Sequence, residues 1–265
     1  MVADPCPGGL RLSGVRASLD GFNLGPVDVE VPPSSILAVA GPNGSGKTTL
    51  LRVIAGLERH NGTVHVCGHA FNYPSPGRAG LVEIVPSEPQ ADPYARVEEI
   101  FDASGVRLAE LEGAELGRRV ARFLPKRFGA LSSGEKRLVC LARGLYSARP
   151  VLLVDEPFAH LDIANQVLVA RELRRRSRRG PLVIALHELH LLPLIATRVL
   201  LLSQGRAVLA ASADELASRI SLLSKVYGAP LLAARADGIT IILPTIRGGP
   251  VPGGGGSEGP TPEGV

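Results

Sequence analysis

A short segment from Gly41 to Thr48 matches the pattern GxxxxGKT and follows an apolar run at 36–40. Glycines allow successive backbone N–H groups to converge on one anion, and a helix that follows adds positive potential at its N-terminus. A helical pattern begins at Lys47. Strand, glycine-rich loop and helix in this order are typical of a loop that binds nucleotide phosphates. The residues expected to bind the nucleotide here are Gly41, Pro42, Asn43, Gly44, Ser45, Gly46, Lys47, Thr48 and Thr49.

Two carboxylates, Asp155 and Glu156, directly follow a second apolar run at 151–154. Within a phosphate-binding site, Lys47 would contact the β and γ phosphates and the hydroxyl of Thr48 would bind Mg²⁺. Asp155 would hold the same ion through water, and Glu156 would orient or deprotonate the attacking water. Many strands end in two acids, so this interpretation depends on the phosphate loop. The combination predicts hydrolysis of a nucleoside triphosphate.

A third segment, LSSGE at 131–135, precedes a helical pattern at 136–146. A serine and a backbone amide at a helix N-terminus can bind an anion. The same residues fit equally well as a helix N-cap, in which Ser132 or Ser133 lies over Glu135. Local physics does not separate these two interpretations.

The order of these motifs resembles that of the ATP-binding-cassette (ABC) ATPases, and the resemblance covers nearly everything from residue 10 to 247. Segment 131–135 is similar to the LSGGQ signature of that family, with a serine in place of the first glycine and a glutamate in place of the glutamine. Its Ser132 precedes Asp155 by the usual distance. The resemblance implies ATP and Mg²⁺ as ligands.

Two later positions extend the resemblance. The dipeptide that ends in Asp162 is similar to the D-loop, which places Asp162 among the nucleotide-binding residues, and His187 is similar to the switch histidine that contacts the γ-phosphate. The resemblance therefore implies catalytic roles for Glu156 and His187. The resemblance further implies that Ser132 and Gly134 of one subunit close over ATP held by another, so that ATP drives dimerisation.

The sequence departs from the family pattern at two positions. The Q-loop glutamine usually lies about 40 residues after the phosphate-loop lysine, and Ser87 occupies that position here. We expect Ser87 to bind a water of the Mg²⁺ shell, with Gln90, three residues later, as the alternative Q-loop residue. The aromatic ring that stacks on adenine is expected near residues 18–19, and Phe22 is the nearest candidate.

Apolar runs rich in β-branched residues alternate with helical patterns, which favours an α/β fold with a mainly parallel sheet. Buried parallel strands are expected at 36–40, 151–154 and 182–186, and the alternating segment 62–68 predicts a hairpin in an antiparallel side sheet. By resemblance, the core is a P-loop NTPase of the RecA-like type with a helical subdomain inserted at about 88–146. The helix-favouring composition of residues 95–146 agrees with this.

The domain is expected to span residues 10–247. Residues 248–265 contain eight Gly and four Pro and predict a disordered tail. A helix is expected at about 163–176, with Ile163, Val167 and Ala170 on one stripe. Its basic end favours a solvated helix terminus, with a phosphate or lipid contact as the alternative.

The composition limits the possible partners and compartment. The chain of 265 residues has a formal net charge of +4. Aromatic residues make up only 4% and there is no Trp, and this scarcity argues against a stacking surface for single-stranded nucleic acid. The three Cys are far apart, so metal clusters and disulfide frameworks are poorly supported and a reducing compartment is favoured. No apolar segment is long enough to predict a membrane-spanning helix.

Three short segments narrow the resemblance to one branch of the family. LDIANQ at 161–166, LHEL at 186–189 and YGAP at 227–230 resemble ATPases that serve importers of iron-siderophores, haem and cobalamin. This implies an ATPase subunit at the cytoplasmic face of the membrane, with separate permease subunits, a second ATPase subunit and a possible substrate-binding protein. An ABC exporter is the main alternative. Non-transport cassettes with long coiled-coil insertions do not fit, because Lys47 and Leu131 lie too close in sequence.

Overall fold

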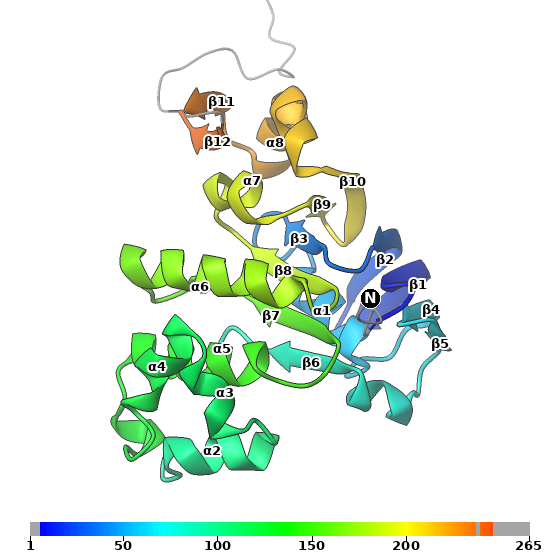
Figure 1. Ribbon diagram of the computed structural model, residues 1–265. Helices are drawn as coiled ribbons and strands as arrows, with labels where there is room; N and C mark the ends of the chain where they lie inside the picture. Colours follow the sequence, from blue (N-terminus) through cyan, green and yellow to red (C-terminus); the bar gives the residue numbers. More distant parts are fainter. Residues whose placement is uncertain (1–5, 237–238, 246–265) are drawn as a thin grey trace, which may run out of the picture.

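A six-stranded sheet forms the centre of the protein, in the order β10-β9-β3-β8-β7-β6. The structure, a computed structural model, describes residues 6–236 and 239–245 (Figure 1). The strands are β3 (Ile36–Ala40), β6 (Val82–Val85), β7 (Val151–Asp155), β8 (Leu182–Leu186), β9 (Arg198–Ser203) and β10 (Arg206–Ser212). Every residue of β3, β7 and β8 is buried, as parallel strands covered on both faces require. The three predicted buried strands and the α/β class are therefore confirmed.

The register of this sheet brings three polar segments to one edge. Ala40 pairs with Leu186, and Asp155 pairs with Ala185, in parallel ladders. Because the carboxyl ends of parallel strands meet at the same edge, the segments that follow β3, β7 and β8 must lie together.

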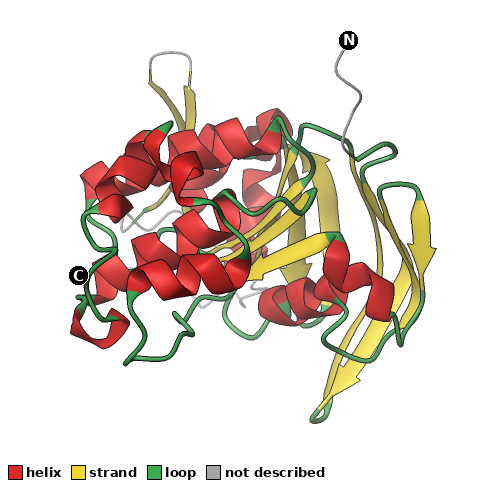
Figure 2. Ribbon diagram, turned by 60° about the horizontal axis from the view of Figure 1, so that its bottom comes forward, coloured by secondary structure: helices red, strands yellow, loops and turns green. Residues whose placement is uncertain are grey.

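The predicted antiparallel side sheet is also present, in the order β2-β1-β4-β5. Its strands are β1 (Leu10–Leu19), β2 (Phe22–Val31), β4 (Asn61–Val66) and β5 (His69–Phe71). One hydrophobic core lies between this sheet, helix α1 (Lys47–Ala55) and the central sheet. Figure 2 shows most of the helices on the far side of the central sheet from these strands.

A disulfide joins Cys6 to Cys67, which corrects the expectation that the spacing of the cysteines gives little support to a disulfide. The two residues are 61 positions apart in sequence. The antiparallel pairing of Leu10 with Val66 brings them together, because it aligns the segment before β1 with the end of β4. Cys140 is a free, buried thiol.

A helical layer follows β6, at the bottom of Figure 1. It contains α2 (Val97–Ser104), α3 (Leu108–Glu112), α4 (Glu115–Ala121), the short 3₁₀ helix η2 (Phe128–Ala130) and α5 (Ser133–Leu145). The helical character predicted for 95–146 is confirmed. The boundaries of the subdomain and of the domain stay predictions.

Helix α6 (Ile163–Ser177) contains the predicted apolar stripe, but the stripe is not the most buried part of the helix. Ile163 is 79% exposed and Val167 is 46% exposed. The residues that pack into the core are Leu168, Val169 and Leu173. Two members of the predicted stripe, Ile163 and Val167, are therefore on the surface, whereas Ala170 is partly buried and packs against the core.

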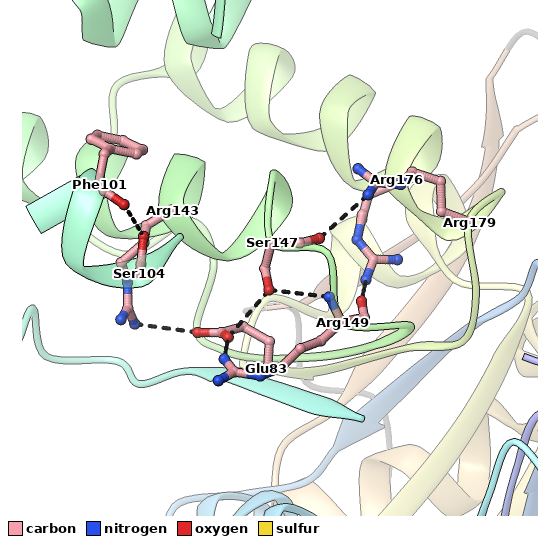
Figure 3. Close-up of polar contacts among 8 residues, drawn as sticks. All are labelled: Glu83, Phe101, Ser104, Arg143, Ser147, Arg149, Arg176 and Arg179. Atoms are coloured by element: carbon pink, nitrogen blue, oxygen red, sulfur yellow. Dashed lines mark hydrogen bonds and ion pairs between the residues drawn. The ribbon is translucent and has the colours of Figure 1, made fainter. Parts of the chain in front are cut away.

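The basic end of α6 is not a fully solvated terminus. Arg176 is only 3% exposed, and its Nη2 donates to the carbonyl oxygens of Arg149 (2.5 Å) and Pro150 (3.3 Å). Figure 3 shows this contact beside Glu83 of β6, a buried carboxylate that pairs with Arg143 at 3.5 Å and with Arg149. Together these contacts attach the C-terminal ends of α5 and α6 to the central sheet.

The C-terminal part adds small elements at the top of Figure 1. They are η3 (Leu189–Leu191), α7 (Leu192–Ile195), η4 (Ala213–Arg219), α8 (Ile220–Tyr227), β11 (Leu231–Ala236) and β12 (Ile239–Pro244), while η1 (Pro76–Gly80) precedes β6. The expected tail at 248–265 lies outside the described residues. Among the described residues, none of the helices combines the length and apolar character that a membrane-spanning helix requires.

Candidate active site

The loop between β3 and α1 has backbone positions that require glycine. Gly41 has a φ of +149°, and a Cβ there would lie 2.2 Å from the carbonyl oxygen of Leu202. Gly46 has a φ of +102° at the N-cap of α1, where no side chain caps the helix. The Lys47 side chain folds back over the loop, and its Nζ donates to the carbonyl oxygens of Gly41 (2.8 Å) and Pro42 (3.0 Å). The loop thus surrounds a buried ammonium group at an uncapped helix N-terminus, as phosphate binding requires.

The charge of Lys47 has little solvent around it. The residue is 6% exposed, and burial lowers the pKa of its ammonium group, while the carboxylates of Glu156 and Asp155 oppose that shift. The hydroxyl oxygen of Ser45 is also buried and has no hydrogen-bond partner. Both groups are donors that an anion in the loop would satisfy.

Asp155 and Thr48 form an oxygen cluster beside the loop. The Thr48 hydroxyl donates to Asp155 Oδ2 at 2.8 Å, and Asp155 is 3% exposed. Burial raises the pKa of the Asp155 carboxyl, with the hydrogen bond from Thr48 acting against this. Its other oxygen, Oδ1, is buried without a partner. A buried, unpartnered carboxylate oxygen next to a hydroxyl fits the hard oxygen ligands that Mg²⁺ prefers.

Glu156 and His187 point toward each other across the ends of β7 and β8. His187 Nε2 and Glu156 Oε1 are 2.5 Å apart, and each side chain is about one-third exposed (34% and 33%). Glu156 has a φ of +49°, a left-handed backbone conformation that is rare for a non-glycine residue. Such strain is typical of functional positions that the surrounding structure holds in place.

A pocket of about 860 Å³ brings these groups together. Its lining combines the phosphate loop, the facing pair and the turn between β1 and β2: Leu19, Asp20, Phe22, Asn43, Gly44, Gly46, Lys47, Thr48, Thr49, Glu156 and His187. Phe22 therefore lies where a ring could meet a base. Ser18 lines a neighbouring pocket instead.

Comparison with known proteins places the chain in a family. A family model described as ABC transporter matches residues 24–159. The hemin import ATP-binding protein HmuV of Streptomyces coelicolor is 40% identical to this chain, over 84% of the chain and 83% of HmuV. The chain belongs to the ABC transporter family. As an ATPase subunit of that family it binds and hydrolyses ATP.

Two further proteins are similar to this ABC ATPase over most of its length. HmuV of Rhodococcus jostii is 33% identical over 92% of the chain and 89% of that protein. A solved structure of an ATP-binding subunit of an ABC transporter matches the fold with a TM-score of 0.73, over 83% of this chain and 98% of that one, at 22% identity. The predicted family and fold are confirmed.

Both candidates for the Q-loop position of this ABC ATPase line one groove. The groove, of about 450 Å³, lies between α1, β6 and α5, and contains Ser87, Gln90, Thr48 and Asp155. The serine and the glutamine thus share a cavity with both proposed Mg²⁺ ligands. Ser87 as the residue near the ion stays a prediction, with Gln90 as its alternative.

Ser132, Gly134 and Asp162, which are expected to contact nucleotide, lie on segments that do not line the pocket of their own chain. Ser132 caps α5, because its Oγ accepts from the amide of Glu135 at 3.3 Å and Glu135 Oε2 accepts from the amide of Ser132 at 2.8 Å. Asp162 caps α6 by accepting from the amide of Asn165 at 2.7 Å. Gly134 lies in the first turn of α5. The N-cap interpretation of the signature is therefore present in the single chain, and binding of ATP by these residues stays a prediction.

Sequence reasoning missed Arg137, which contacts the ends of both β6 and β7. It is fully buried at 0% exposure, although it carries a charge. A signal was available: Arg137, Cys140, Leu141 and Gly144 follow the spacing of one helix face, and all four are buried. A lone arginine on an apolar helical face indicates a buried guanidinium that must find acceptors inside the protein.

Proposed function

We propose that this chain powers the import of hemin, or of a closely related iron chelate, through a separate membrane permease. The cargo is proposed on the 40% identity to the hemin import ATP-binding protein HmuV of Streptomyces coelicolor. The short segments at 161–166, 186–189 and 227–230, which resemble the metal-chelate branch, support the same choice.

The observation that carries the ATPase step is that one pocket is lined by the phosphate loop, by Thr48 and by the Glu156–His187 pair. The hydroxyl of Thr48 is in turn bonded to Asp155. Lys47 and the loop amides bind the β and γ phosphates of ATP. Thr48 and Asp155 would hold Mg²⁺, with Ser87 binding a water of its shell, and the ion would neutralise charge on the phosphates.

Hydrolysis then needs a base and a group near the γ-phosphate. Glu156 accepts a proton from the attacking water while the oxygen of that water bonds to the γ-phosphorus. At the same time the bond between the γ-phosphorus and the β–γ bridging oxygen breaks, and ADP leaves. His187 holds the Glu156 carboxylate in place and donates toward the γ-phosphate. These roles are supported by the 2.5 Å contact between the two side chains and by their position in the pocket.

Two copies of the chain would complete each site. Ser132, Gly134 and Asp162 do not line the pocket that contains Lys47 of their own chain, and we propose that they contact ATP bound by a second copy. The dimer would sit at the cytoplasmic face of the membrane, below its permease, and a substrate-binding protein would deliver the chelate. We propose no nucleic-acid partner.

Transport into vesicles tests this proposal. Inside-out and right-side-out vesicles that contain the chain and its co-purifying permease would receive hemin, a ferric siderophore or cobalamin, with ATP on the side of the ATPase. ATP-dependent movement of hemin toward the ATPase side supports the proposal, and Glu156→Gln should abolish it. Movement away from that side would show an exporter, and movement of another chelate in place of hemin would contradict the cargo.

A further inference from the structure

We propose that Arg137 is a positioning residue that links the signature helix α5 to the catalytic Glu156, so that a movement of α5 changes the geometry of hydrolysis. This inference rests on the proposed role of Glu156 as the group that activates water. It concerns a residue that does not line the nucleotide pocket.

The guanidinium of Arg137 joins two neighbouring strand ends. Its Nη1 donates to the carbonyl oxygens of Pro86 (2.5 Å) and Ser87 (3.2 Å), after β6. Its Nη2 donates to those of Asp155 (2.5 Å) and Glu156 (2.9 Å), at the end of β7. Four carbonyls on one planar fork form a contact that only arginine can make, because a lysine ammonium is a point donor without this spread.

The contact with Glu156 acts on a strained backbone. Glu156 has a φ of +49°, and its carbonyl oxygen is held by Arg137 while its carboxylate is held by His187. The orientation of the peptide after Glu156 sets the direction of its side chain. A displacement of the guanidinium therefore moves the carboxylate relative to the attacking water, without any direct contact between Arg137 and substrate.

Arg137 moves with the signature. It lies on α5, one helical turn after the first residue of the helix, Ser133. The opposite end of α5 is attached to the central sheet through the ion pair of Arg143 with Glu83 at 3.5 Å, shown in Figure 3. With that end fixed, a tilt of α5 displaces its N-terminal half most, which is where Arg137 lies.

This linkage also accounts for the serine at the Q-loop position. The short side chain of Ser87 cannot reach from the ion to the helical layer. Its main-chain carbonyl, however, is bonded to the same guanidinium that holds Asp155 and Glu156. The connection between this loop and the hydrolysis site thus passes through Arg137 and the backbone.

The test compares two buried arginines. Arg137→Lys and Arg137→Gln would be measured beside Arg176→Lys, a matched control, since Arg176 is also buried and donates to two loop carbonyls away from the nucleotide pocket. For each variant we would measure the melting temperature, ATP affinity, and kcat and KM with and without the permease in proteoliposomes.

We expect the Arg137 variants to bind ATP within about 3-fold of wild type but to lose ~10–100-fold in permease-stimulated kcat, with Lys less affected than Gln. Arg176→Lys should lose melting temperature and keep kcat within about 2-fold. The proposal would be overturned if the Arg137 and Arg176 variants lost kcat equally and in proportion to their loss of melting temperature. That result would show that Arg137 has a structural role only. An inactive wild type would contradict the proposed function itself.

A measurement on the wild type covers the case in which the Arg137 variants do not fold. Amide hydrogen exchange would be followed in the wild-type complex with and without a non-hydrolysable ATP analogue. We expect protection to change together in 84–88, 134–141 and 155–158. A change in 134–141 that leaves 155–158 unaffected would overturn the linkage.

Discussion

His187 Nε2 lies 2.5 Å from Glu156 Oε1, although the two residues are 31 positions apart in sequence. The contact exists because β7 and β8 are adjacent parallel strands, with Asp155 paired to Ala185, so the residue after each strand reaches the same edge. One imidazole nitrogen is thereby committed to the carboxylate. The contact lies where the γ-phosphate is expected, which ties the base and the phosphate contact into one unit.

Glu156→Gln should bind ATP normally and hydrolyse it 10²–10⁴-fold more slowly, because the amide cannot accept the proton of the water. Single-turnover hydrolysis together with equilibrium binding of ATP checks this. His187→Ala serves as the companion variant, and should lower kcat while leaving ATP affinity within a few-fold. Near-wild-type turnover by Glu156→Gln would remove the assignment of Glu156 as the base.

Lys47→Ala should lose nucleotide binding rather than turnover alone. The ammonium is buried between the loop carbonyls and would face the phosphates in the ground state. Titration with a fluorescent ATP analogue measures the affinity, and melting temperature without nucleotide controls for folding. Unchanged affinity in a folded variant would contradict the phosphate-loop interpretation.

Mg-ATP should convert the Glu156→Gln protein from a monomer or weak associate to a dimer. In the proposed dimer, Ser132 and Gly134 would complete the site only across two copies, so ATP that is not hydrolysed would hold the copies together. Sedimentation velocity with and without Mg-ATP tests this, and Ser132→Arg should prevent dimerisation while leaving ATP binding to the monomer intact. A monomer at saturating nucleotide would point to a different partner ATPase.

Asp155→Asn should stabilise the nucleotide-free protein while weakening its response to Mg²⁺. Burial raises the pKa of Asp155 above its ordinary value of 3.8. The folded state therefore holds this proton to a higher pH than the unfolded chain, and its stability falls as pH rises from 3.8 through the raised value. Above that window the charged carboxylate is a continuing penalty, which the asparagine removes.

For Asp155→Asn, a rise in melting temperature of about 2–4 °C at pH 7 corresponds to ~1 kcal/mol in a protein of this size. The difference should shrink as pH falls through the raised pKa of Asp155, because the folded protein then holds the proton. Thermal scans at pH 4 and 7, with and without Mg-ATP, measure both effects. A lower melting temperature at pH 7 would show that the carboxylate stabilises the empty site.

Much of this protein follows from local sequence. The strand at 36–40, the glycine-rich loop and the helix that begins at Lys47 were all predicted, and the structure contains them as β3, loop and α1. Short-range rules suffice there, since a glycine at φ > 0, an apolar run and a helix start depend on neighbours within a few residues. The carboxylates after β7 were predictable for the same reason.

Other features were decided only by the tertiary structure. The sequence shows an apolar stripe on α6, but Ile163 at its start is exposed because the positions of the elements packed against α6 decide which residues are buried. The disulfide of Cys6 with Cys67 needs the pairing of β1 with β4, which no local pattern specifies. In both cases the result depends on contacts with residues that are distant in sequence.

The sequence by itself determined the family, the ligands expected in the loop and the types of residue available for hydrolysis. Only the tertiary structure decided which of these groups touch, and it added Arg137, whose four acceptors come from two strand ends about 18 and 50 residues away in sequence. The physical reason is the distance in sequence over which each kind of interaction acts. Backbone propensity and side-chain type act between neighbours, whereas burial and hydrogen bonding of a charged group depend on where distant strands place their carbonyls.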